Sequence, residues 1–242
     1  MLPLTIADQQ QHIEQSEQML TAVFSGDAPT LYWSIAEPAG LVLGYSQKHE
    51  ILNPAALVAL QIPIYHRRAG GTAVLVGAHL LSLDVALPAD HPLVLPDIVE
   101  SYRWLGEAWV AALAQLDIQT RTVTVQEARE QRALLKQSET RERESLLRHA
   151  CYGSLSPYEV VVGQSKVVGL DMIRRRAGSL LQAGILLHWE TKELVQLLGH
   201  TPEEQALLRE GLRERAVGID TLAGRVVTAE KVIGAFEEVV FH

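Results

Sequence analysis

The sequence contains a single cysteine among its 242 residues, and this scarcity excludes an internal disulfide. Long apolar runs are also missing, since none approaches the roughly 18 residues that a membrane-spanning helix needs. The first residues, MLPLTIADQQQ, lack a basic segment followed by an apolar stretch and so do not resemble a signal peptide. We therefore expect a cytoplasmic protein that does not associate with a membrane.

Positive charge is in the minority. The chain has 21 lysines and arginines against 29 aspartates and glutamates, which gives a formal net charge of -8. This balance argues against binding to nucleic acid or to an anionic membrane, because both need a basic surface. Basic residues do cluster at 67–68, 141–148 and 174–176, and such a patch could steer a small acidic partner. The alternative is that each cluster is an ordinary solvated face.

Motifs for nucleotide and metal binding are missing as well. Neither GxGxxG nor GxxxxGK followed by Ser or Thr occurs, which argues against a doubly wound nucleotide-binding fold. The sequence also shows no His and Cys cluster with the spacing of metal ligands, so we expect no bound metal.

What is present is an ordinary globular composition, 48% hydrophobic and 21% charged. Apolar periodicity and turn residues predict a mixture of helices and hairpin strands. Helices are expected at 6–25, 95–116 and from 201 and 228 onward, with a short helix opening at Asn53-Pro54. Strands are expected at 30–36, 40–46, 62–67, 79–88, 158–162, 166–173 and 179–188.

These elements do not alternate regularly between strand and helix. The sequence therefore predicts an α+β fold with a mixed, largely antiparallel sheet flanked by helices. We expect one domain over residues 1–242, with 191–242 as a small helical C-terminal appendage. The charged segment 126–148 fits either an exposed helix or a partly mobile loop, and periodicity does not decide between them.

Cys151 is the first candidate for chemistry. A lone cysteine is more often a small buried apolar residue than a nucleophile. Here the cysteine follows His149 and precedes Gly153 and Pro157, which places it in a loop before a strand, where reactive groups are commonly exposed. His149 and the nearby arginines could favour the nucleophilic thiolate.

Lys166 is the second candidate. A lysine near a turn is most often simply solvated, but this one heads the apolar strand KVVG after a hairpin turn at 163–165. The strand could fold back and bring the amine to Cys151, where a cation would stabilise negative charge on an acyl oxygen.

A strand end with glycines is the third candidate. Arg67 and Arg68 precede Gly70 and Gly71, and paired glycines let a ligand approach the backbone closely. Free N–H groups there could bind a carbonyl or a phosphate, although an ordinary turn is the simpler alternative. Gln47 belongs to a further polar strand end, LGYSQK.

Three segments in order resemble the biotin/lipoate protein ligase superfamily. They are LGYSQK, IYHRRAGGTAVLVGAHLLSLDVALP and CYGSLSPYEVVVGQSKVVGLDMIRRRAGSLLQAGILL. The cysteine and the SPYE that follows it are most similar to cysteine-dependent octanoyltransferases, and the resemblance extends over most of the chain.

The resemblance implies a function and its partners. Such enzymes move an octanoyl, or here alternatively a lipoyl, group from acyl carrier protein to a lysine of a lipoyl domain. Cys151 would carry the acyl group as a thioester and Lys166 would hold its carbonyl. Substrate-binding roles fall to positions along the expected acyl tunnel and its mouth, namely Gln47, Arg67, Gly70, Gly71 and Gly169. Arg67 would in addition steer the acidic carrier and lipoyl domains, and no cofactor is implied.

Departures from the family pattern keep two alternatives open. Ala69 stands where Ser or Thr is usual, Val76 where a histidine is frequent, and Leu170, Asp171 and Met172 where the pattern is Ser/Thr-Ala-Gln. One alternative is an ATP-dependent lipoate-protein ligase, which would need ATP and Mg. The other is a diverged, non-catalytic homologue that binds an acyl chain or a lipoyl-domain protein.

Overall fold

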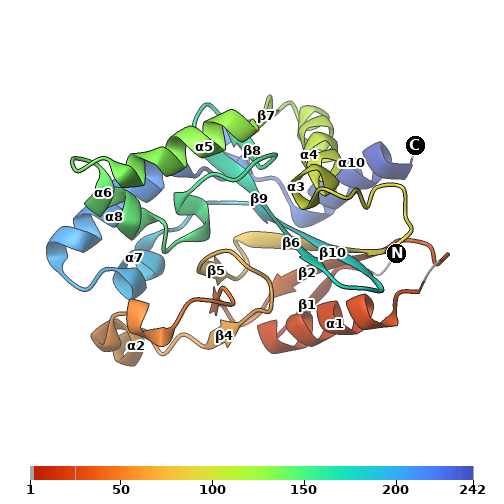
Figure 1. Ribbon diagram of the computed structural model, residues 1–242. Coiled ribbons are helices and arrows are strands. Elements are labelled where there is room, and N and C mark those ends of the chain that lie inside the picture. Colours follow the sequence, from red (N-terminus) through yellow and green to blue (C-terminus); the bar gives the residue numbers. More distant parts are fainter. Residues whose placement is uncertain (1–2, 25, 242) are drawn as a thin grey trace.

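Two β-sheets organise the chain in the computed structural model, which describes residues 3–24 and 26–241 (Figure 1). The strands are β1 (Thr5–Ala7), β2 (Thr30–Ala36), β3 (Gly40–Leu43), β4 (Ile64–His66), β5 (Val74–Val76), β6 (Leu80–Pro88), β7 (Arg121–Thr122), β8 (Val160–Val162), β9 (Ser165–Arg174) and β10 (Gly178–Leu186).

Helices separate and cover these strands. The α-helices are α1 (Gln9–Ala22), α2 (Pro54–Leu60), α3 (Ile98–Ser101), α4 (Arg103–Ala114), α5 (Val125–Ala133), α6 (Arg141–Leu147), α7 (Lys192–Leu198), α8 (Pro202–Arg215), α9 (Ile219–Ala223) and α10 (Ala229–Phe241). Three short 3-10 turns complete the order: η1 (His49–Ile51), η2 (Leu134–Lys136) and η3 (Cys151–Gly153).

The larger sheet has seven strands in the order β1-β2-β6-β10-β9-β8-β7. Only the β1–β2 pair is parallel, and the long strands β6, β10 and β9 are joined by antiparallel pairing. The smaller sheet has the order β4-β3-β5 and contains one parallel and one antiparallel pair. The prediction of a mixed, largely antiparallel sheet flanked by helices is confirmed.

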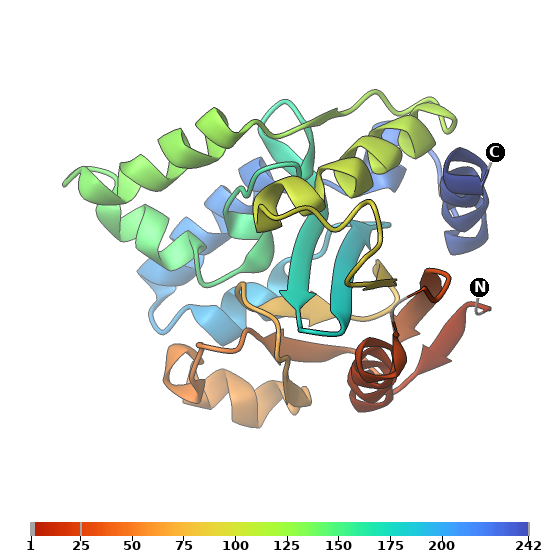
Figure 2. The ribbon, with the colours of Figure 1, turned by 45° about the vertical axis from the view of Figure 1, so that its right-hand side comes forward.

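The two faces of the larger sheet have different chemistry. Along β6, alternate residues point to opposite faces, as the period of a strand requires. Residues 81, 83, 85 and 87 join the main core, whereas Ser82 and Asp84 line a cavity beside α1. In Figure 2 α1 (red) lies near the turn of the β9–β10 hairpin (cyan), where Met19 and Leu20 pack against Leu180.

The main core lies between the other face and the helices α4 and α10. Trp33 of β2 contacts Trp109 of α4 edge-on at a ring-centroid distance of 5.9 Å, and Phe236 of α10 at 5.5 Å. Phe236 and Trp109 are 4.4 Å apart. The regular structure described after residue 191 is helical, as expected for the C-terminal part. Its last helix packs into the same core as the central strands.

A second apolar cluster joins the smaller sheet to α2, α6, α7 and α8 at the opposite end of the molecule (Figure 1). The short helix predicted at Asn53-Pro54 is confirmed. The side chain of Asn53 caps α2 by accepting a hydrogen bond of 3.0 Å from the backbone N–H of Ala55.

Two expected helices differ in their extent, and a segment that the sequence left open has a defined structure. The helix predicted over 6–25 begins only at Gln9, because Thr5–Ala7 pair with β2 and Asp8 caps the helix. The helix predicted over 95–116 is divided at Tyr102 into α3 and α4. The segment 126–148 is largely helical, through α5 and α6, which favours the first of its two interpretations.

Candidate active site

Cys151 opens the turn η3 directly after α6 and is half-buried. Its backbone N–H donates a hydrogen bond of 2.7 Å to the carbonyl oxygen of Ala73, and the N–H of Ala73 donates one of 2.9 Å to His149. This bridge fixes the cysteine beside the segment that follows Gly71. Burial lowers the pKa of the His149 imidazole, which opposes the expected role of this residue as a positive charge that favours the thiolate.

Lys166 is the second residue of β9 and its side chain is 1% exposed. Its Nζ donates hydrogen bonds of 2.8 Å to the carbonyl oxygen of Cys151 and 2.7 Å to Oε1 of Glu159. The hairpin between β8 and β9 therefore brings the lysine to the main chain of the cysteine. Both residues line one cavity of about 590 Å³, a size typical of a small-molecule site.

Glu159 is a functional candidate that sequence reasoning missed. Its carboxylate accepts a hydrogen bond of 2.6 Å from the N–H of Ser156 in addition to the bond from Lys166. Burial raises the pKa of the Glu159 carboxyl, and the Lys166 ammonium opposes that rise. The signal was an acidic residue at the head of the apolar run EVVV, since a buried lysine needs a partner of opposite charge.

Arg67 lies in the wall of the cavity. Its Nη1 is 3.6 Å from Oδ2 of Asp171, and its Nη2 donates a hydrogen bond of 3.2 Å to the carbonyl oxygen of Thr72. The guanidinium is thus half-buried and held by these two contacts. The role of Arg67 in steering acidic domains stays a prediction. Asp171, one of the departures from the family pattern, places a carboxylate beside it.

The two glycines after Arg67 have different positions. Gly71 lines the cavity with φ of +81°, and a Cβ on this residue would lie 2.4 Å from Nη2 of Arg67. Only glycine satisfies both conditions. Gly70 is exposed and is not among the described residues that line the cavity.

Gln47 and Gly169, both predicted to bind substrate, have different positions relative to the cavity. Gln47 accepts a hydrogen bond of 3.1 Å from the N–H of Gly44 and donates one of 3.0 Å to the carbonyl oxygen of His149. It braces the segment before Cys151 and is not among the described lining residues of the main cavity. Gly169 does line it, and the missing side chain keeps the floor open beside Glu159.

The cavity continues from Cys151 and Lys166 toward α1, where its lining becomes polar. Asp84 of β6 is buried, and its carboxyl contacts Ser16 of α1 and Gln182 of β10. Burial raises the pKa of the Asp84 carboxyl, and these hydrogen bonds oppose the rise. The sequence analysis did not select Asp84. An acidic residue inside the otherwise apolar strand LLSLDVALP is the feature that could have indicated it.

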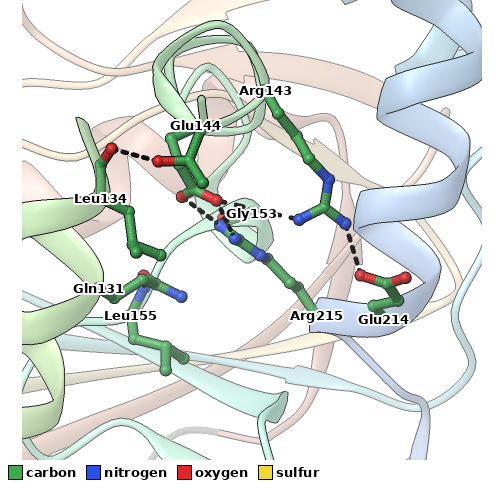
Figure 3. A network of polar contacts seen from close by, with 9 residues as sticks. Gln131, Leu134, Arg143, Glu144, Gly153, Leu155, Glu214 and Arg215 are labelled. Atoms are coloured by element: carbon green, nitrogen blue, oxygen red, sulfur yellow. Dashed lines mark hydrogen bonds and ion pairs between the residues drawn. The ribbon is translucent and has the colours of Figure 1, made fainter. Parts of the chain in front are cut away.

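A buried ion pair supports the turn that carries Cys151 (Figure 3). Arg215, at the end of α8, donates hydrogen bonds of 2.9 Å to Oε2 of Glu144 in α6 and 2.7 Å to the carbonyl oxygen of Gly153. The N–H of Val217 donates one of 3.1 Å to the carbonyl oxygen of Lys166. Residues at and just after the end of α8 therefore contact the main chain of η3 and of Lys166, which supports both candidate catalytic residues.

Known protein families and individual proteins that are similar to this chain agree with one another. The family model described as Lipoyl protein ligase A/B catalytic domain matches residues 8–241. The chain is 31% identical over 214 residues to Octanoyltransferase LipM of Exiguobacterium sibiricum, covering 86% of this chain and 73% of that one. It is also 31% identical over 215 residues to Octanoyltransferase LipM of Clostridioides difficile, covering 87% and 74%.

Solved structures share the fold. A bi-partite lipoate protein ligase from Thermoplasma acidophilum aligns with a TM-score of 0.75 at 19% identity, covering 98% of this chain and 80% of that one. Lipoate-protein ligase A bound with ATP aligns with a TM-score of 0.72 at 19% identity, covering 99% of this chain and 82% of that one.

None of the helices described here has the length and apolar character that crossing a membrane requires.

Proposed function

Because the chain belongs to the family of lipoyl protein ligase A/B catalytic domains, we propose that this acyltransferase carries an octanoyl group on Cys151 and passes it to a lysine of a lipoyl domain. One observation supports this most directly. Nζ of Lys166 lies 2.8 Å from the carbonyl oxygen of Cys151, at the wall of a cavity that both residues line.

The first step exchanges one thioester for another. Cys151 first loses its thiol proton to solvent, and the thiolate attacks the carbonyl carbon of the donor, so that a negative charge develops on the acyl oxygen. The C–S bond of the donor then breaks, and the departing thiolate takes up a proton from solvent. A lysine ammonium has three N–H groups. Two of those on Lys166 bond to Cys151 and Glu159, which leaves one to stabilise the acyl oxygen.

The second step forms an amide. The neutral amine of the target lysine attacks the Cys151 thioester, the C–S bond breaks, and the thiol takes up the proton released by the amine. Because an amide is more stable than a thioester, this step drives the transfer forward. We propose acyl carrier protein as the donor and lipoyl domains as acceptors, as expected for an octanoyltransferase. No cofactor enters either step.

Intact-mass spectrometry after incubation with octanoyl acyl carrier protein tests the thioester. The chain has a single cysteine, so a hydroxylamine-sensitive mass increase of one octanoyl group can lie only on Cys151. We expect the adduct in the unaltered protein and its absence in Cys151→Ala. Lys166→Met should slow loading by about 100- to 1,000-fold, as loss of an oxyanion donor does.

The same experiment separates the two alternatives. Transfer to a lipoyl domain that survives Cys151→Ala and requires octanoate, ATP and Mg would replace the proposal with an ATP-dependent ligase. Binding of octanoyl carrier protein without an adduct, and without transfer from either donor, would replace it with a non-catalytic homologue.

A further inference from the structure

Tyr152 follows Cys151 directly in the turn η3, is only 3% exposed, and lines the same cavity as Cys151 and Lys166. Neither step of the proposed acyl transfer uses its side chain. The hydroxyl donates a hydrogen bond of 2.7 Å to the carbonyl oxygen of Gly184 in β10. Nζ of Lys166 lies over the ring, 5.5 Å from its centroid. One side chain thus connects the turn that carries the cysteine both to the sheet and to the ammonium.

The bond to Gly184 has a fixed direction. A carbonyl oxygen can only accept a hydrogen bond, so the tyrosine hydroxyl must donate it. Burial raises the pKa of the Tyr152 hydroxyl well above its ordinary value, which keeps this group protonated at neutral pH. The turn η3 has three residues, and Tyr152 is the middle one. Its bond to β10 therefore restricts the movement of Cys151, the residue before it.

The ring of Tyr152 is itself held in place. It packs against Trp189 with a ring-centroid distance of 5.5 Å, and Nε1 of Trp189 donates a hydrogen bond of 3.0 Å to the carbonyl oxygen of Leu212 in α8. An ammonium within about 6 Å of the centroid of an aromatic ring is attracted to the face of that ring. The ring therefore offers Lys166 a fixed surface in addition to its two hydrogen bonds.

A pair of glycines makes room for the tyrosine hydroxyl. Gly169 of β9 and Gly184 of β10 are opposite each other in the sheet. A Cβ on Gly169 would lie 3.7 Å from Oη of Tyr152, which is an ordinary contact, but a Cβ on Gly184 would lie 3.0 Å from it. The second distance is shorter than a relaxed contact between non-bonded atoms. The position of the hydroxyl therefore depends on glycine at 184.

We propose that Tyr152 is a positioning residue for acyl transfer, which anchors the turn carrying Cys151 to β10 and holds the ammonium of Lys166 beside that turn. Gly184 is the position in the sheet that admits its hydroxyl. The inference rests on the proposed function. Tyr152 acts through the cysteine and the lysine, and it exchanges no proton with the acyl donor.

Loading of Cys151 by octanoyl acyl carrier protein, followed by intact-mass spectrometry at several donor concentrations, tests the positioning. Tyr152→Phe keeps the ring and loses the bond to Gly184, so the maximal loading rate should fall about fivefold. The donor concentration that gives half of this rate should change by less than about twofold, because the hydroxyl is bonded to the sheet and not to the donor. Tyr152→Leu also loses the ring beside Lys166 and should slow loading about 100-fold.

Alkylation by iodoacetamide reports on the same turn without any acyl donor. The chain has one cysteine, so the mass increase lies on Cys151. Release of η3 from β10 exposes this half-buried thiol, and Tyr152→Phe should therefore be alkylated about fivefold faster while it is loaded more slowly. Tyr32→Phe is the matched control, since the hydroxyl of Tyr32 is also buried and lies 2.7 Å from Nδ1 of His12. It should leave both rates within about twofold of the parent.

A double variant tests the contact between the hydroxyl and the glycine. Gly184→Ala pushes the hydroxyl away and should slow loading about tenfold. Tyr152→Phe removes the atom that the new methyl group meets. The double variant should therefore load no more slowly than Tyr152→Phe alone, because the two changes act on one contact. If the methyl group instead obstructed the acyl chain, the two losses would multiply.

Each outcome decides the inference, and circular dichroism confirms that the variants compared are folded. Rates of Tyr152→Phe that equal those of the parent would overturn it, as would losses that multiply in the double variant. A decrease in both loading and alkylation would also overturn it, because the hydroxyl would then act on the reactivity of the thiol and not on its position. If the parent protein forms no octanoyl thioester, the proposed function fails, and the alkylation rates still decide whether Tyr152 fixes the turn.

Discussion

Nζ of Lys166 lies 2.7 Å from Oε1 of Glu159, and the two side chains are 1% and 3% exposed. This pair neutralises a lysine that otherwise would be a lone charge in the interior. The carboxylate thus compensates for the loss of hydration that burial imposes on the lysine beside Cys151.

Replacing Glu159 by alanine should therefore destabilise the fold. Loss of one partner of a buried ion pair costs about 3–5 kcal/mol, because the other charge is left uncompensated. Urea unfolding monitored by circular dichroism measures this free energy of unfolding. The double variant Glu159→Leu with Lys166→Met should recover much of the loss. An unchanged unfolding midpoint in the single variant would show that Lys166 does not depend on this carboxylate.

Arg215 offers a second prediction, with a matched control in the same network. Arg215→Met removes the nearer of the two arginine partners of the buried Glu144 and the donor to Gly153, so a loss of about 3–5 kcal/mol is expected. Arg143 lies 3.9 Å from Glu144 and makes its short contact with Glu214, which is 52% exposed, so Arg143→Met should cost at most about 1 kcal/mol. Chemical denaturation of both variants provides the comparison, and equal losses would contradict the burial argument.

The two neighbouring glycines should respond differently to alanine. Gly71→Ala requires φ of +81° and collides with Arg67, so it should cost about 1–3 kcal/mol. It should also slow acyl loading, because the guanidinium must move. At Gly70 no atom lies within 4 Å of an added Cβ, so Gly70→Ala should change stability by less than about 1 kcal/mol. Thermal melts and loading rates of the two variants, measured in parallel, would refute this account if they coincide.

Asp84 should make stability depend on pH with a definite sign. Burial raises its pKa in the folded protein, so between the unfolded and the folded pKa the folded state binds more protons than the unfolded state. The contribution of Asp84 to stability is therefore greatest below the unfolded pKa and falls as the pH rises through the folded pKa. The slope for a single group is at most about 1.4 kcal/mol per pH unit.

Asp84→Asn provides the reference for this measurement. The asparagine does not titrate, so the stability of the variant relative to the parent should increase as the pH rises from about 4 toward neutrality. Denaturant melts at several pH values yield this difference, in which the other carboxyl groups cancel. A difference that is flat or falls with pH would mean that folding does not raise the pKa of Asp84.

Individual residues show which parts of the site and the fold can be predicted from the sequence. Cys151 and Lys166 are 15 positions apart, across one turn and one hairpin, so their proximity could be predicted from local signals. The irregular mixture of strands and helices predicted the fold class, the order of three motifs predicted the family, and both are confirmed. The beginning of α1 was misplaced because β1 pairs with a strand more than 20 residues away, and no local pattern reveals such pairing.

Periodicity, turn residues and motif order are local features, and they were enough to predict the fold class, the family and the two residues proposed for acyl transfer. The groups that surround these residues come from distant parts of the chain. Asp84 and Gln182 are 98 residues apart and Glu144 and Arg215 are 71 apart, yet strand register and helix packing place each pair in contact. Whether a buried polar group has a partner depends on such register, because a shift of one residue turns every side chain to the other face of the sheet.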